Sequence, residues 1–138
     1  MEWWICLGIN KMEYAQYIVV RKDLVPIMGV GKCGAMCAHS SVGAILNNGK
    51  LYDHPNIQAW IAGRFVKLVV YVKTKQKLLN LHKKLNDLGI RNVLIYDACR
   101  TVFEEPEESN GTTLVSLGVL PLNRNEVPKC LQVLRLLD

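Results

Sequence analysis

Apolar residues follow different periods along the chain, and these periods predict alternating strands and helices. Short runs rich in β-branched and aromatic residues are typical of strands, and the run at 66–72 is nearly continuous, as expected of a strand buried on both faces. The predicted strands are 16–21, 66–72, 92–96 and 112–118. The predicted helices are 32–46, a short one that has Asp53 or His54 as its cap and runs from Pro55 toward Ala62, 75–88, and a last one with Pro128 in its first turn.

The segment from Thr74 to Gly89 carries the clearest helical pattern. Thr74 supplies an N-cap hydroxyl, and Gly89 is a typical C-terminal stop. Between them, four leucines recur at the spacing of one helix face and are expected to pack on the core: Leu78, Leu81, Leu85 and Leu88. The opposite face is expected to meet water through Lys75, Lys83, Lys84 and Asp87.

Helices separate most of the predicted strands, and this order favours an α/β fold. Strands joined in this way form a mixed sheet with helices on both faces, which gives a three-layer α/β/α arrangement with four strands. The 138 residues and 15.6 kDa suit one domain. We assign that domain to 15–138 and treat 1–14 as an N-terminal extension.

Several features bear on where the protein resides. No window approaches the roughly 18 uninterrupted apolar residues of a membrane span. The apolar start at 3–9 has no basic residue before it and no cleavage site after it, so a signal peptide is not expected. Five cysteines without regular spacing suit reduced thiols. We therefore expect a cytoplasmic protein with neither a membrane segment nor a structural disulfide.

The charge is basic and unevenly distributed. A formal net charge of +5 and a pI near 9.0 favour an acidic partner such as nucleic acid. Basic residues dominate 64–91, where Asp87 is the single acidic residue, whereas 104–108 is acidic. Such a basic stretch is either a solvated face or a phosphate-binding face. The candidate phosphate contacts are Lys67, Lys73, Lys75, Lys83 and Lys84.

Two familiar cofactor patterns are present only in form. The segment 29–34 satisfies G-x-G-x-x-G, but it does not follow directly on the strand at 16–21 as a dinucleotide fingerprint would, which disfavours a nicotinamide-dependent oxidoreductase. A P-loop is excluded because no Ser or Thr follows Gly31-Lys32. The spacing typical of zinc ligands is also absent from Cys33, Cys37 and His39. Neither a nicotinamide cofactor nor a metal ion on these residues is therefore expected.

Two groups of polar residues are candidates for a reaction site. One face of the helix at 32–46 presents Lys32, Met36, His39 and Gly43. Lys32 also falls at the helix start, where free backbone N–H groups favour an anion. Asp97 ends a buried strand, the edge at which open α/β sheets bind ligands, and Arg100 and Thr101 follow in the loop.

These segments resemble the type II peptidyl-tRNA hydrolase family over about 16–137. The resemblance rests on 17–24 (YIVVRKDL), on the segment from Gly31-Lys32 through Ala35 to His39, and on 97–101 (DACRT). Asp53-His54-Pro55 and the closing 135–137 also resemble a divergent branch, the peptidyl-tRNA hydrolase domain-containing proteins. The resemblance implies an α/β fold with a four-stranded mixed sheet, often in a homodimer. It also implies an enzyme that cleaves the ester between a peptide and the 3′ ribose of tRNA, without a metal or organic cofactor.

The resemblance also implies the site residues. Its catalytic positions are Lys32, His39, Asp97 and Thr101, and Arg100 accompanies them as a substrate-binding residue. We expect Asp97 to take the proton of an attacking water, Lys32 to stabilise the oxyanion, and Thr101 to position the water or Asp97. His39 either orients this cluster or contacts the terminal ribose.

Two positions depart from the family pattern. A glutamine is usual where this chain has Met36, and a glycine is usual at Cys99. The departure at Met36 raises an alternative from a different class, a non-catalytic RNA- or protein-binding module on the same fold. The intact Lys32, Asp97 and Thr101 favour the enzyme.

Overall fold

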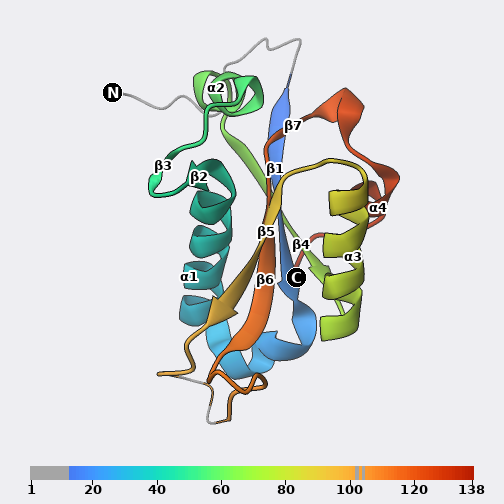
Figure 1. The fold of residues 1–138 in the computed structure, drawn as a ribbon. Coiled ribbons are helices and arrows are strands. Elements are labelled where there is room, and N and C mark those ends of the chain that lie inside the picture. Colours follow the sequence, from blue (N-terminus) through green and yellow to red (C-terminus); the bar gives the residue numbers. More distant parts are fainter. Residues whose placement is uncertain (1–12, 102, 104) are drawn as a thin grey trace.

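The computed structural model describes residues 13–101, 103 and 105–138, and Figure 1 shows their arrangement. The expected extension at 1–14 lies almost wholly outside these residues. The main sheet comprises β1 (Tyr14–Arg21), β4 (Val66–Val72), β5 (Asn92–Asp97), β6 (Thr113–Val119) and β7 (Leu122–Asn123). A separate small hairpin consists of β2 (Leu46–Asn47) and β3 (Lys50–Leu51). The helices are α1 (Val25–Ile45), α2 (Pro55–Ala62), α3 (Lys75–Asp87) and α4 (Lys129–Gln132), with 3-10 turns η1 (Lys22–Leu24) and η2 (Arg124–Glu126).

The sheet is mixed, as predicted. Its strand order is β4-β1-β6-β5, with β1 parallel to β4 and antiparallel to β6, and β5 antiparallel to β6. β1, β4 and β5 therefore run in the same direction and end at the same end of the sheet. The fifth strand, β7, pairs with the start of β1 and was not predicted, because two residues are too short to show a strand period.

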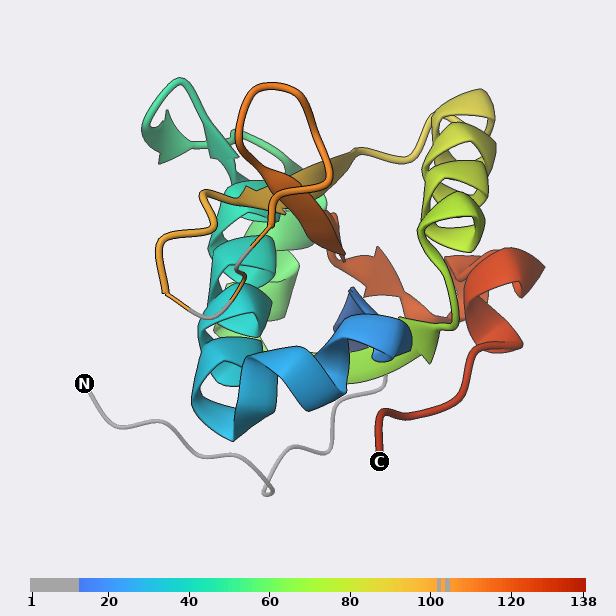
Figure 2. The same cartoon turned by 90° about the horizontal axis from the view of Figure 1, so that it is seen from below.

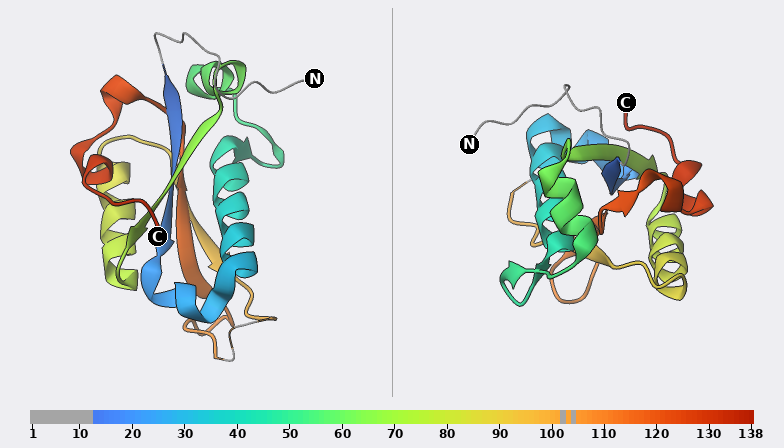
Figure 3. Two further views of the ribbon diagram at one scale, coloured as in Figure 1. Left: turned by 180° about the vertical axis from the view of Figure 1, so that it is seen from behind. Right: turned by 90° about the horizontal axis from the view of Figure 1, so that it is seen from above.

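Helices cover both faces of the sheet, so the predicted α/β fold is confirmed. α1 lies on one face, and α3 and α4 lie on the other (Figures 1 and 3). The apolar residues form one core cluster under each layer: Val70, Leu81 and Leu117 belong to the cluster that includes α3, and Ile18, Met28 and Met36 belong to the cluster under α1. Along the described residues, no helix is both long and apolar enough to cross a membrane.

The predicted helix ends are largely confirmed. Thr74 caps α3 by accepting a hydrogen bond from the Lys77 N–H, and the His54 side chain caps α2 by accepting one from the Asn56 N–H. One detail of α3 was wrong: Leu88 is 47% exposed, because the helix has ended and its last leucine turns away from the sheet. β4 was predicted to be buried on both faces, but as an edge strand only part of it is buried.

α1 is longer than the predicted 32–46 and contains a break. It begins at Val25, and Gly29 interrupts it with φ 72° and ψ 177°, a backbone conformation that essentially only glycine adopts. The helix restarts after Gly29, so Lys32 falls in the first turn of the second segment, where the sequence placed it.

α1 packs very closely on β6. A Cβ built on Gly118 would lie 2.0 Å from the carbonyl oxygen of Ser40, so only glycine fits there. The buried hydroxyls of Ser40 and Ser116 share a hydrogen bond of 2.7 Å, and the Gln16 side chain donates to the Ser41 carbonyl at 3.0 Å. These hydrogen bonds fix where α1 lies along the sheet, and they thereby fix the position of Lys32 relative to the end of β5.

Candidate active site

The candidate site lies at the end of the sheet where β1, β4 and β5 finish and α1 begins, which Figure 2 shows from below. This is the end at which α/β sheets place their ligands. Here the Lys32 ammonium lies 2.7 Å from Oδ1 of Asp97 and donates a hydrogen bond of 3.1 Å to Oγ1 of Thr101. We call these three residues the Lys32–Asp97–Thr101 cluster. The structure brings together three of the four side chains that the sequence assigned to catalysis.

Asp97 is held from two sides. The residue is only 6% exposed, and while Oδ1 faces Lys32, Oδ2 accepts a hydrogen bond of 3.0 Å from the backbone N–H of Cys99. A buried carboxylate needs such partners, because an unpaired charge is strongly disfavoured away from water. The two interactions fix the orientation of the carboxyl group at the mouth of the site.

Cys99 occupies a position where the family usually has glycine. Its φ is 58°, in the left-handed region that glycine adopts readily and that costs other residues about 1–2 kcal/mol. The cysteine thus keeps the backbone conformation that directs its N–H to Asp97. Its thiol also donates a hydrogen bond of 3.2 Å to Oγ1 of Thr113 at the start of β6.

Arg21 and Glu107 secure the segment after Thr101, and sequence reasoning missed both. The buried Arg21 guanidinium donates to Glu107 at 2.7 Å, to the Leu114 carbonyl at 2.9 Å and to Asp23 at 2.7 Å. Burial alone would lower the pKa of Arg21, but hydrogen bonds and the charges of Asp23 and Glu107 outweigh it and raise that pKa above its ordinary value. The backbone N–H of Glu107 donates to Thr113 Oγ1, the atom that also accepts from Cys99.

His39 and Met36 lie apart from the cluster. His39 is exposed, and its ring Nδ1–H donates to the Ala35 carbonyl at 2.8 Å, which leaves Nε2 as the acceptor of the neutral ring. Seven residues of helix separate it from Lys32, which is about 10 Å along the axis. Met36 is 4% exposed and packs in the core under α1. The position at which the family usually has glutamine is therefore a buried apolar position here, and it offers the site no amide group.

The predicted RNA-binding side chains have different surroundings. Arg100 is exposed in the loop after Asp97, and Lys73 and Lys84 are exposed as well. Lys75 pairs with Glu108 at 2.5 Å, and Lys83 pairs with Asp87 at 3.4 Å. Lys67 lies 3.3 Å from the centroid of the Phe65 ring, and burial lowers its pKa.

The disfavoured cofactor patterns have other uses in the structure. The G-x-G-x-x-G segment lies within α1, where Gly31 and Gly34 are helical and face open space. Cys33 and Cys37 are adjacent free thiols on that helix, and burial together with Cys33 raises the pKa of Cys37 to about 12. In the part of the chain that the structure describes, no group of three or more His, Cys, Asp or Glu residues could hold a metal ion.

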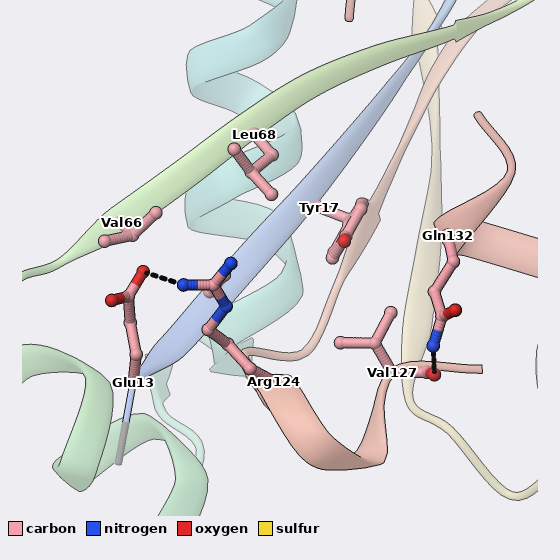
Figure 4. Close-up of a pocket in the computed structure, with 8 residues that line it drawn as sticks. Glu13, Tyr17, Val66, Leu68, Arg124, Val127 and Gln132 are labelled. Atoms are coloured by element: carbon pink, nitrogen blue, oxygen red, sulfur yellow. Dashed lines mark hydrogen bonds and ion pairs between the residues drawn. The ribbon is translucent and has the colours of Figure 1, made fainter. Parts of the chain in front are cut away.

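A pocket opens at the end of the sheet opposite the candidate site, where β1 and β4 begin (Figure 4). Tyr17 and Leu68 contribute to it from the strands, and Glu13 and Arg124 form an ion pair of 3.4 Å at its rim. The Lys32–Asp97–Thr101 cluster lies at the other end of the sheet, where β1 and β5 finish. The pocket is therefore separate from the candidate site.

Comparisons with known proteins agree on one family. A family model described as peptidyl-tRNA hydrolase PTH2 matches residues 14–137. The peptidyl-tRNA hydrolase of Methanococcus maripaludis is 32% identical over 124 residues, which cover 90% of this chain and 99% of the relative. Those of Methanothermobacter thermautotrophicus and Methanopyrus kandleri are 30% and 34% identical, over 88% and 84% of this chain and 98% and 91% of the relatives. None of these matches supports a non-catalytic module.

Proposed function

Because the chain belongs to the peptidyl-tRNA hydrolase PTH2 family, we propose that the Lys32–Asp97–Thr101 cluster is the centre at which it hydrolyses peptidyl-tRNA. The bond cleaved is the ester between the peptide and the 3′ ribose, and the products are free tRNA and a peptide. The observation that carries the assignment is the distance of 2.7 Å between Lys32 and Asp97 at the ligand-binding end of the sheet. It joins a cation and a carboxylate from distant parts of the sequence.

The geometry provides both groups that ester hydrolysis requires. A water oxygen attacks the carbonyl carbon while Asp97 accepts the water proton. An ammonium has three N–H donors, and Lys32 uses two of them on Asp97 and Thr101, so the third is left for the oxyanion. The tetrahedral intermediate collapses by breaking the bond to the ribose oxygen, and Asp97 returns its proton to that oxygen. An activated aminoacyl ester needs no covalent nucleophile for this step.

The other site residues act on the substrate. Thr101 accepts a hydrogen bond from Lys32, so its hydroxyl hydrogen remains available to orient the water or Asp97. His39 contacts the terminal ribose, because the residue is exposed and its ring is hydrogen-bonded to the Ala35 carbonyl, which is not part of the cluster. Arg100, exposed beside Asp97, pairs with a phosphate near the 3′ end.

The basic residues of 64–91 bind the phosphates of the rest of the tRNA. The net charge of +5 supports this assignment, because it favours an acidic partner. The candidates remain Lys67, Lys73, Lys75, Lys83 and Lys84. Release of stalled peptidyl-tRNA, as in ribosome rescue, is the process that this reaction serves in the cytoplasm. A homodimer is the assembly expected for the family.

One experiment tests the assignment directly. Release of free tRNA from an N-acetyl-aminoacyl-tRNA is measured for the parent chain, for Asp97→Asn and for Asp87→Asn, an exposed aspartate on α3 that serves as the control. We expect Asp97→Asn to lower kcat by about 10²–10⁴-fold with the fold intact, and Asp87→Asn to have parent activity. If the parent chain binds tRNA in a salt-sensitive manner without turnover, the chain is a binding module and Met36→Gln is the variant to examine.

A further inference from the structure

A groove runs along the outer edge of the sheet, beside the end of β4. It is lined by Tyr71–Lys73 from β4, by Lys77 from α3 and by Val133–Arg135 from the segment after α4. That segment pairs with β4, because the Tyr71 N–H donates to the Arg135 carbonyl at 3.2 Å and the Leu137 N–H to the Val69 carbonyl at 2.9 Å. Backbone hydrogen bonds thus hold the segment after α4 in a fixed position against β4, on one side of the groove.

The groove is strongly cationic. Three of its lining residues, Lys73, Lys77 and Arg135, are basic, and none of the residues lining it is acidic. Lys73 and Lys77 are exposed, and within the described residues their ammonium groups have neither a hydrogen-bond nor an ion-pair partner. By contrast, Lys75 pairs with Glu108 and Lys83 pairs with Asp87.

Apolar and aromatic surface accompanies these charges. Val133 is 64% exposed, and Tyr71 forms part of the groove with the Lys22 ammonium 4.3 Å from its ring centroid. Lys22 in turn pairs with Asp138 at 2.5 Å. Cations that flank an aromatic ring suit a nucleic-acid strand, whose phosphates pair with cations and whose bases stack on aromatic rings.

The groove and the candidate site share one end of the sheet. β4 and β5 are parallel, the groove lies beside the last residues of β4, and Asp97 is the last residue of β5. The order β4-β1-β6-β5 places them on opposite edges, three strand spacings or about 14 Å apart. Between them, at the end of β1, the carboxylates of Asp23 and Glu107 are paired with Arg21.

We propose that this groove binds the phosphate backbone of the tRNA substrate while the 3′ end reaches the Lys32–Asp97–Thr101 cluster. The inference rests on the proposed function and adds the path of the RNA across the protein. RNA is favoured over an acidic peptide because the groove lies at the same end of the sheet as a site whose proposed substrate is a tRNA ester. Recognition here is independent of base sequence, since the groove offers charge and apolar surface.

The test compares Lys77→Ala, Lys73→Ala/Lys77→Ala and Lys50→Ala, an exposed lysine in the β2–β3 hairpin at the other end of α1. Binding of deacylated tRNA is measured across a range of salt concentrations, and turnover of N-acetyl-aminoacyl-tRNA is measured in parallel. We expect the slope of log Kd against log salt concentration to fall by about 0.7–0.9 for each groove lysine removed. KM rises, kcat at saturation stays at the parent value, and Lys50→Ala leaves the slope unchanged.

Two results would overturn the proposal while leaving the hydrolase assignment intact. One is parent turnover with an unchanged salt slope in the double variant. The other is a double variant that keeps its tRNA affinity but no longer binds a polyglutamate peptide, which would assign the groove to an acidic protein partner. Absence of turnover in the parent chain is a different outcome, because it contradicts the proposed function itself.

Discussion

The Lys32 ammonium lies 2.7 Å from the Asp97 carboxylate, and the two residues reach each other from α1 and β5, elements on different layers of the fold. Their side chains are 17% and 7% exposed, so water screens the ion pair only in part. The pair depends on two remote features, the restart of α1 after Gly29 and the close packing of α1 on β6 at Gly118. The geometry of the proposed catalytic site is therefore a property of how the layers pack.

Lys32→Ala should reduce catalysis far more than binding. The variant removes the donor that we propose for the developing oxyanion, so kcat should fall by about 10²–10³-fold, while Kd for deacylated tRNA changes by less than about threefold. Single-turnover release of tRNA and equilibrium binding measure the two quantities, with Lys50→Ala as the exposed control. Equal losses in kcat and affinity would instead make Lys32 a phosphate-binding residue.

His39→Ala should have the opposite signature. His39 does not touch the cluster, and its one hydrogen bond within the described residues is to the Ala35 carbonyl of its own helix. Removing a hydrogen bond of roughly 1 kcal/mol to the substrate ribose should raise KM by about fivefold, with little change in kcat. Steady-state kinetics on N-acetyl-aminoacyl-tRNA separates the two constants. A variant with parent KM and a strongly reduced kcat would show that His39 orients the cluster after all.

The sequence predicted what is local and missed what is long-range. The leucine period of α3 and the caps at Thr74 and His54 depend on neighbours within one or two helical turns, and they are confirmed. The Arg21–Glu107 pair joins residues that are 86 positions apart in the sequence, and nothing in either local segment indicates its partner. The cluster was predicted through its motifs, whereas the exposed position of His39 follows from how α1 turns on the sheet.

Two glycines that look alike in sequence should respond in opposite ways to alanine. At Gly118 the added Cβ would meet the Ser40 carbonyl at 2.0 Å, so Gly118→Ala should destabilise the fold by at least about 2 kcal/mol. At Gly34, in an open stretch of α1, the same change meets nothing within 4 Å and should stabilise by about 1 kcal/mol. Urea unfolding of both variants measures the difference. Similar stability of the two would mean that α1 does not pack on β6 as described.

The Cys37 thiol should make stability fall at alkaline pH. Burial and the adjacent Cys33 raise its pKa from 9.0 to about 12 in the folded chain. A raised pKa means that the folded state holds the proton more tightly, so this contribution is complete below pH 9 and is lost as the pH rises toward 12. Urea unfolding at pH 8 and pH 10.5 should show a larger loss for the parent chain than for Cys37→Ala. Equal losses would place Cys37 in water.

Glu107→Gln should loosen the segment that follows the cluster. The substitution keeps the shape of the side chain but removes the charge that faces the buried Arg21, whose side chain is 4% exposed. Losing a hydrogen bond to a charged group costs about 1–3 kcal/mol, and urea unfolding measures it against Glu105→Gln, which changes an exposed carboxylate on the same segment.

Glu107→Gln also tests whether the Arg21–Glu107 ion pair affects catalysis. The Glu107 N–H and the Cys99 thiol share Oγ1 of Thr113, and the Cys99 N–H holds Asp97. A displaced segment should therefore lower kcat by several-fold while tRNA affinity is retained, because the groove lysines do not depend on this ion pair. Parent kcat in a destabilised Glu107→Gln would mean that Asp97 is held by Lys32 and Cys99 alone, and that the Arg21–Glu107 pair serves only the stability of the fold.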